Sequence, residues 1–183
     1  MKVDAWHLPW GRDTVPHGLL DIIRGCNISC NACYNSLPPR VKSLSEIEDD
    51  LTTMMSHRRL EAVSLVGGEV LLHPHLCDII RLIRARGPSA HIFTNGVLLD
   101  EERLSQLKEA GLGMIVLHID RGQTRPDLPP NPSRDQLRGL WEAKTALVAK
   151  HGIDVGLSMT VFEDTLSDVR DIVFQRRKPH VDM

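Results

Sequence analysis

The 183-residue sequence carries little excess charge of either sign, with a formal net charge of -2 at pH 7. It has neither the basic surplus that favours binding to nucleic acid nor an acidic tail. No apolar run approaches the roughly 20 residues of a membrane-spanning helix. The first residues, MKVDAW, lack the apolar segment of a secretory signal peptide. We therefore expect a soluble, cytoplasmic protein that binds neither nucleic acid nor a membrane.

Cysteine is also scarce, and its four residues are unevenly placed. Cys26, Cys30 and Cys33 share one short segment with the spacing C-x3-C-x2-C. Clustered cysteines in a chain without a signal peptide favour a metal centre over disulfide bonds. The fourth, Cys77, lies in an apolar segment and is expected to be a buried structural thiol.

Three thiolates on one loop restrict the kind of metal centre. They do not complete a tetrahedral zinc site, which needs four ligands. They do suit a [4Fe-4S] cluster in which three irons take cysteine and the fourth iron stays open. The spacing alone leaves zinc possible if a further ligand comes from His73, His75 or Cys77.

Hydrophobic patterning predicts an alternation of strands and helices. Strands are expected over residues 18–24, 62–66, 90–94, 114–120 and 153–161. Helices are expected from Ser43 or Ser45 to about His57, over residues 74–86, from Asp100 to Gly111, from Ser133 to Lys150, and near 167–175. Ser43 and Ser45 each precede a glutamate by three residues, as in a capping box.

Five βα units predict an α/β fold with a parallel sheet and outer helices. Residues 1–17 are expected to form an N-terminal arm, and residues 18–183 one domain. Residues 179–183 are typical of the opening of a sixth strand. The patterning does not distinguish an open sheet from a barrel, but in either case ligands bind at the carboxyl ends of the strands.

Polar motifs follow two of the predicted strands. Residues 67–69 read Gly-Gly-Glu, in which the glycines let backbone approach a ligand closely and the carboxylate can pair with an ammonium group. Residues 94–96 read Thr-Asn-Gly. A glycine-rich turn and an ordinary Asn-Gly turn are the structural alternatives for these two motifs.

The predicted fourth strand ends in two further candidates. Alternation along a strand places His118 and Asp120 on the same face. A carboxylate there can accept hydrogen bonds from hydroxyl groups, and a histidine can contact substrate or carry a proton, or simply be a buried structural residue. Thr160, Arg121 and Arg125 are weaker candidates near the same edge.

Taken together, these motifs resemble those of the radical S-adenosylmethionine (radical SAM) enzymes. The resemblance consists of the C-x3-C-x2-C loop followed by the aromatic Tyr34, then Gly-Gly-Glu, Thr-Asn-Gly and, in place of a Ser-x-Asp pattern, His118-Ile119-Asp120. Two positions depart from the family. Val70 stands where proline is usual, and His118 stands where serine is usual.

The resemblance implies a partial (βα)6 TIM-like barrel whose last strand is incomplete. It also implies a [4Fe-4S] cluster on Cys26, Cys30 and Cys33, with SAM chelated at the open iron. Reductive cleavage of SAM then yields a 5'-deoxyadenosyl radical, which abstracts hydrogen from a substrate. By the same resemblance, Asp120 and His118 are the candidate catalytic residues. The implied SAM-binding residues are Tyr34, Gly67, Gly68, Glu69, Thr94, Asn95, Asp120 and Thr160.

The resemblance leaves the substrate open. An electron donor of the flavodoxin or ferredoxin type is implied, together with an unidentified small-molecule or peptide substrate. The first strand and the Gly-Gly-Glu region are most similar to enzymes that modify peptides, build cofactors or act as maturases. An activase that makes a glycyl radical on a partner, and a truncated barrel that binds a cluster or SAM without turnover, are the alternatives.

Overall fold

A five-stranded parallel sheet forms the centre of the computed structural model, which describes residues 11–35, 37–166 and 169. Its strands run in the order β1-β3-β4-β5-β7, and each pairs in parallel with its neighbour. They are β1 (Thr14–Ile23), β3 (Arg59–Gly67), β4 (Ser89–Thr94), β5 (Leu112–His118) and β7 (Asp154–Ser158).

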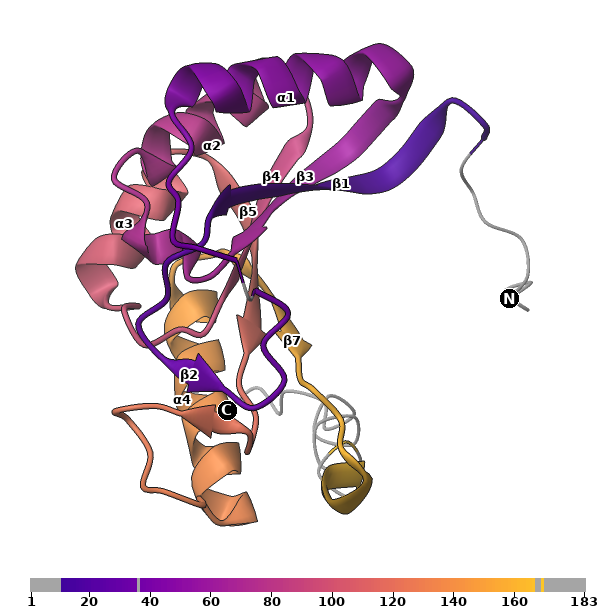
Figure 1. Cartoon of the computed structure of the whole chain (residues 1–183). Coiled ribbons are helices and arrows are strands. Elements are labelled where there is room, and N and C mark those ends of the chain that lie inside the picture. The colour runs from indigo at the N-terminus through magenta and orange to yellow at the C-terminus, as the bar shows by residue number, and fades with distance from the viewer. Residues whose placement is uncertain (1–10, 36, 167–168, 170–183) are drawn as a thin grey trace.

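Four helices connect these strands and lie along one side of the curved sheet (Figure 1). They are α1 (Leu44–His57), α2 (Leu76–Ala85), α3 (Glu101–Glu109) and α4 (Arg134–Lys150). Two short 3-10 turns follow β3 and β7, namely η1 (Val70–Leu72) and η2 (Glu163–Thr165). The predicted parallel α/β sheet with outer helices is confirmed.

The two faces of the sheet differ in burial because the four described connecting helices cover one of them (Figure 1). In β4, Ala90, Ile92 and Thr94 are buried, whereas the alternate residues His91 and Phe93 are half-buried. The period-2 alternation of a strand sends the first set towards the helices and the second set to the concave face. The concave face therefore has space for ligands at the carboxyl ends of the strands.

Helix starts follow the predicted capping chemistry. The hydroxyl of Ser43 accepts from the amide of Glu46, and the Glu46 carboxylate accepts from the amide of Ser43 at 2.8 Å. This capping box satisfies two backbone donors that a helix start leaves free. Asp100 caps α3 in the same manner by accepting from the amide of Arg103 at 2.7 Å.

The core lies between the sheet and the helices. One apolar face of α2 is completely buried, and so are Ile47 and Leu51 of α1. Burying a side chain of this size stabilises the fold by about 1.5–3 kcal/mol. The buried Trp141 of α4 also forms a hydrogen bond, in which its indole nitrogen donates to the carbonyl of Ile119 at 3.0 Å. This bond fixes α4 against the residue just after β5.

Several boundaries differ from those predicted. β1 begins at Thr14, so the end of the expected N-terminal arm is part of the sheet. β7 ends at Ser158, three residues before the predicted end, because the chain then turns towards β5. A short antiparallel pair, β2 (Ser29–Cys30) with β6 (Gln123–Thr124), was not predicted, because two residues carry no periodic pattern.

Three predictions concern parts of the chain that the structure does not describe. The predicted helix near 167–175 lies largely outside the described residues, and residues 179–183 and 1–10 lie entirely outside them. In the described part of the chain, no helix has the length and apolar character required to span a membrane.

Candidate active site

The cysteine loop follows β1 and is fastened to the segment that follows β5. Cys30 pairs with Gln123 in the short β2–β6 ladder. Next to it, the amide of Asn31 donates to the carbonyl of Gly122 at 2.8 Å. The segments that follow β1 and β5 are therefore hydrogen-bonded to each other at the carboxyl-end edge of the sheet, although these two strands are not neighbours.

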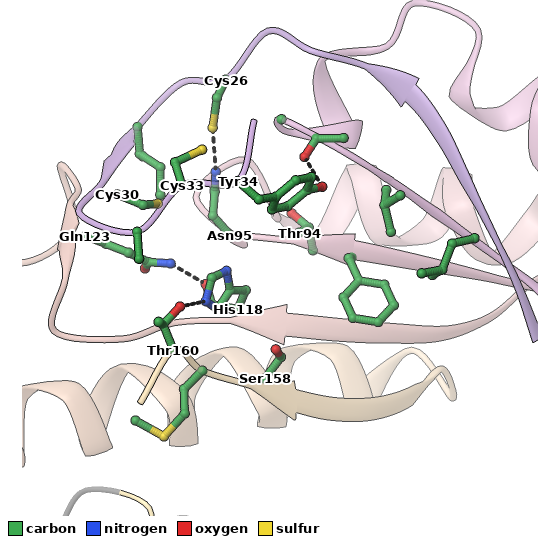
Figure 2. A pocket seen from close by; sticks show the side chains of 18 of the residues that line it. Cys26, Cys30, Cys33, Tyr34, Thr94, Asn95, His118, Gln123, Ser158 and Thr160 are labelled. Carbon is green, nitrogen blue, oxygen red and sulfur yellow. Dashed lines mark hydrogen bonds between the residues drawn. The ribbon is translucent and has the colours of Figure 1, made fainter. Parts of the chain in front are cut away.

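All three cysteines of the loop are free thiols that line one cavity of about 520 Å³ (Figure 2). Cys26 and Cys33 are exposed, and Cys30 is half-buried. Burial, reinforced by the nearby charge of Asp120, raises the pKa of the Cys30 thiol to about 11. Without a metal this thiol keeps its proton, and metal binding there must release it.

The two glycines that follow β3 have a steric role. Gly67 has a φ of +153°, and a Cβ at this position would lie 1.9 Å from the carbonyl oxygen of Ile23. A Cβ on Gly68 would lie 2.1 Å from the carbonyl oxygen of Gly25. Both contacts are shorter than any side chain tolerates, so glycine is required where β3 ends against the start of the cysteine loop.

Backbone hydrogen bonds exploit this close approach. The amide of Gly68 donates to Ile23 at 2.7 Å, and the amide of Glu69 donates to Gly25 at 2.9 Å. From the other end of the loop, the Tyr34 hydroxyl donates to the carbonyl of Gly67 at 2.8 Å. The Gly-Gly pair is therefore hydrogen-bonded to both ends of the cysteine loop. A glycine-rich surface turn, the structural alternative, would not require these contacts.

Glu69 lies behind the cavity and does not line it. Its carboxylate is fully buried and accepts from the Thr94 hydroxyl at 2.6 Å, from the amide of Leu71 at 3.0 Å and from the amide of Asn95 at 2.8 Å. Burial raises the pKa of Glu69, and these hydrogen bonds oppose that shift. In this arrangement Glu69 positions the Thr-Asn-Gly turn, and a direct contact with SAM stays a prediction.

Asn95 connects that turn to the cysteine loop. Its side-chain amide donates to the Asn27 side chain at 2.7 Å and lies 3.9 Å from Cys26 Sγ (Figure 2). Its side-chain oxygen accepts from the amide of Val97 at 3.0 Å, which fixes the orientation of the amide group. Thr94 and Asn95 both line the cavity, and their contact with SAM stays a prediction.

His118 and Asp120 lie together at the end of β5. His118 Nε2 is 2.9 Å from Asp120 Oδ2, and the amides of Thr160 and Gly122 donate to the same carboxylate at 3.0 and 2.9 Å. Burial opposes ionisation of Asp120, but these hydrogen bonds outweigh it and lower its pKa. His118 and Thr160 line the cavity, whereas Asp120 is buried behind them.

Arg125, a weak candidate in the sequence, is the centre of a buried network. Its guanidinium is 1% exposed and forms a bidentate pair with Asp127, at 2.6 and 3.0 Å. It also donates to the carbonyl of Asn95 at 2.9 Å and to the Gln123 side chain at 2.7 Å. Gln123 in turn donates to the carbonyl of His118 at 3.0 Å. No sequence motif marks Gln123, and only the tertiary contacts identify it.

The donor set fits a cluster better than a single metal ion. Cys26, Cys30 and Cys33 supply three thiolates from one loop, one ligand fewer than the four of a tetrahedral zinc site. An iron–sulfur cluster binds each thiolate at a different iron. His73 is also unsuited to be a zinc ligand, because its ring nitrogens already bond Lys42 and His75.

Comparison with known proteins agrees with this geometry. The family profile described as "Radical SAM superfamily" matches residues 20–175, which is most of the chain. The chain belongs to the radical SAM superfamily. Enzymes of this family use a [4Fe-4S] cluster and SAM, so the predicted family and cofactors are confirmed.

Individual relatives cover the chain almost completely but are much longer. The Fe-coproporphyrin III synthase of Methanosarcina barkeri is 25% identical over 98% of this chain and 46% of that protein. The PqqA peptide cyclase of Gluconobacter oxydans is 31% identical over 84% of this chain and 44% of that protein. The chain thus spans less than half the length of these curated relatives.

Solved structures confirm the fold. The native anSMEcpe structure with bound AdoMet matches with a TM-score of 0.62 over 88% of this chain and 49% of that chain, at 17% identity. At this level of identity the match establishes the architecture alone. The predicted partial barrel of the radical SAM type is therefore consistent with the five described strands.

Proposed function

We propose that this radical SAM chain binds a [4Fe-4S] cluster through Cys26, Cys30 and Cys33 and cleaves SAM reductively to start hydrogen abstraction from a substrate. The observation that carries the proposal is one cavity at the carboxyl ends of the strands. It brings the three free thiols together with the Gly67–Gly68 backbone and the Thr94–Asn95 turn.

Each wall of the cavity has a separate task in this proposal. When bound, the cluster supplies the electron that cleaves the sulfonium of SAM. The Gly67 and Gly68 backbone lies beside the cysteine loop without side chains that obstruct it. Asn95 fixes the Cys26 end of the loop through Asn27. The β2–β6 ladder fixes the Cys30 end.

His118 and Thr160 form the opposite wall and face the same cavity (Figure 2). Asp120 fixes both, because its carboxylate bonds the His118 ring and the Thr160 amide. We assign His118 a role in contacting the substrate or the SAM ribose, and Asp120 the positioning of that wall. An electron donor of the flavodoxin or ferredoxin type belongs to the same proposal.

The reaction class that we propose is modification of a peptide or construction of a cofactor. Two of the relatives support this class, since one is a PqqA peptide cyclase and the other an Fe-coproporphyrin III synthase. A glycyl-radical activase is the alternative enzyme class. A domain that binds the cluster or SAM without turnover is the alternative that the experiment below distinguishes.

The decisive experiment is anaerobic reconstitution with iron and sulfide, followed by EPR of the dithionite-reduced protein with and without SAM. We expect a [4Fe-4S]⁺ signal that changes when SAM is added, and formation of 5'-deoxyadenosine. A cluster signal without any response to SAM supports the non-catalytic alternative. Retention of zinc alone, without a cluster, overturns the proposal.

Two cysteine variants form a matched pair for this experiment. Cys30→Ala should lose the cluster signal, because it removes one of three thiolates. Cys77→Ala should keep it, because Cys77 lies on α2, outside the cavity, with its thiol near the carbonyl of Gln106. Equal loss in both variants would indicate a folding defect instead of a ligand role.

A further inference from the structure

The cavity has no permanently charged side chain in its lining. Among the described residues that line it, none is Asp, Glu, Lys or Arg. Three nearby charged side chains, those of Glu69, Asp120 and Arg125, are buried outside the lining and are hydrogen-bonded there. Glu69 accepts three hydrogen bonds, and Arg125 is paired with Asp127. Asp120 is held by His118 and two backbone amides.

The lining is also divided along the strands. At the carboxyl ends of the strands it includes backbone and neutral polar groups, represented by Gly68, Thr94 and Asn95, together with apolar residues of the cysteine loop and of the segment after β7 (Ile28, Ala32 and Met159). Further back along the sheet it is mostly apolar, with Leu19 on β1, Val66 on β3 and Phe93 on β4. His17 on β1 is the polar side chain at that end.

Leu19 is unusual because it is a large apolar side chain that is 58% exposed. It lies on the concave face, while its neighbour Leu20 is buried on the helix side. An exposed leucine on a ligand-binding face loses its contact with water when an apolar group binds beside it, which favours such a ligand. The same position offers nothing to a phosphate or a carboxylate.

We propose that the part of the substrate that enters this cavity is an uncharged aliphatic or aromatic group, contacted by Leu19, Val66 and Phe93. This inference rests on the proposed function, and it places SAM beside the cysteine loop and the substrate group further back along the sheet. A phosphorylated or carboxylate-bearing group is disfavoured, because no Lys or Arg is among the described lining residues and burying an unpaired charge beside these apolar side chains is strongly unfavourable. The group can belong to a peptide side chain or to a free small molecule.

The test uses saturation-transfer NMR on the reconstituted protein with SAM at pH 8, with three probes. N-acetyl-L-phenylalaninamide presents an aromatic side chain with peptide groups, toluene presents the aromatic group alone, and N-acetyl-L-aspartic acid α-amide presents a side-chain carboxylate. We expect the phenylalanine probe to bind and the aspartate probe to give no signal. Binding of toluene as well indicates recognition of the apolar group alone, and its failure indicates that peptide groups contribute.

Leu19→Asp should weaken binding of the phenylalanine probe by about tenfold or more, as expected for altering an apolar pocket. Because Leu19 is exposed, this variant should leave the core intact. Leu72→Asp is the control, because Leu72 is 42% exposed but lies outside the cavity lining. Preferential binding of the aspartate probe, or equal loss of affinity in both variants, overturns the inference.

This outcome is separable from failure of the proposed function. If the EPR signal responds to SAM while the aspartate probe binds best, the reaction class stands and the substrate class is wrong. If no cluster forms, the proposed function fails. Probe binding that depends on Leu19 still defines an apolar site in that case.

Discussion

Replacing Arg125 by Met is the most informative single perturbation of this structure. The change removes the donors that serve Asp127, Gln123 and the carbonyl of Asn95, and it leaves the Asp127 carboxylate without its partner. Removing one member of a buried ion pair typically destabilises a protein by about 3–5 kcal/mol. Because the Asp127 side chain is 26% exposed and can regain water, we expect the lower end, about 3 kcal/mol.

Urea unfolding followed by circular dichroism measures this loss. The double variant Arg125→Met with Asp127→Leu should recover most of it, since replacing both partners by apolar groups leaves no unpaired charge. Arg138→Met is the control, because Arg138 pairs with Asp135 on the surface and should cost well under about 1 kcal/mol. A cost below about 1 kcal/mol for Arg125→Met, or no recovery in the double variant, would refute the reasoning.

The pair also predicts a dependence of stability on pH. Burial opposes ionisation of Asp127, but the hydrogen bond and charge of Arg125 outweigh it and lower the pKa of Asp127 in the folded state. A lowered acid pKa stabilises the fold above the unfolded value, about 3.9, and this contribution is lost as the pH falls below it. Unfolding measured from pH 6 to pH 3 should therefore show a smaller acid loss in Asp127→Asn than in wild type.

Two further predictions concern the ends of β3 and β4. Gly68→Ala should destabilise the chain by about 1–3 kcal/mol and reduce iron bound per chain, because its Cβ would lie 2.1 Å from the carbonyl oxygen of Gly25. Gly139→Ala on α4, where a Cβ meets nothing within 4 Å, should be neutral or stabilising. Glu69→Gln should cost about 1–3 kcal/mol, since an amide nitrogen would face the Thr94 hydroxyl or the Asn95 amide. Glu69→Gln should also weaken SAM binding, measured by equilibrium dialysis, more than it lowers the iron bound per chain. An unchanged affinity for SAM would show that Glu69 does not position the SAM-binding turn.

The sequence by itself determined the architecture and the chemistry of the cysteine loop. Strands and helices were predictable because one-sided burial imposes a period of 2 on strands and 3.6 on helices. The capping box is local, so the four residues from Ser43 to Glu46 suffice to mark it as a candidate, with Ser45 as the alternative start. The spacing of Cys26, Cys30 and Cys33 is equally local, because three ligands on one loop need no distant partner to be recognised.

The tertiary structure alone decided which polar residues face the cavity and which support it. Glu69 and Asp120 were predicted as contacts, yet both carboxylates are buried by donors that come from other strands. Arg125 and Gln123 acquire their importance from Asn95, His118 and Cys30, which are distant in sequence. Periodicity specifies the face on which a side chain lies. It cannot specify the hydrogen-bond partner, since that depends on how separate strand ends meet in space.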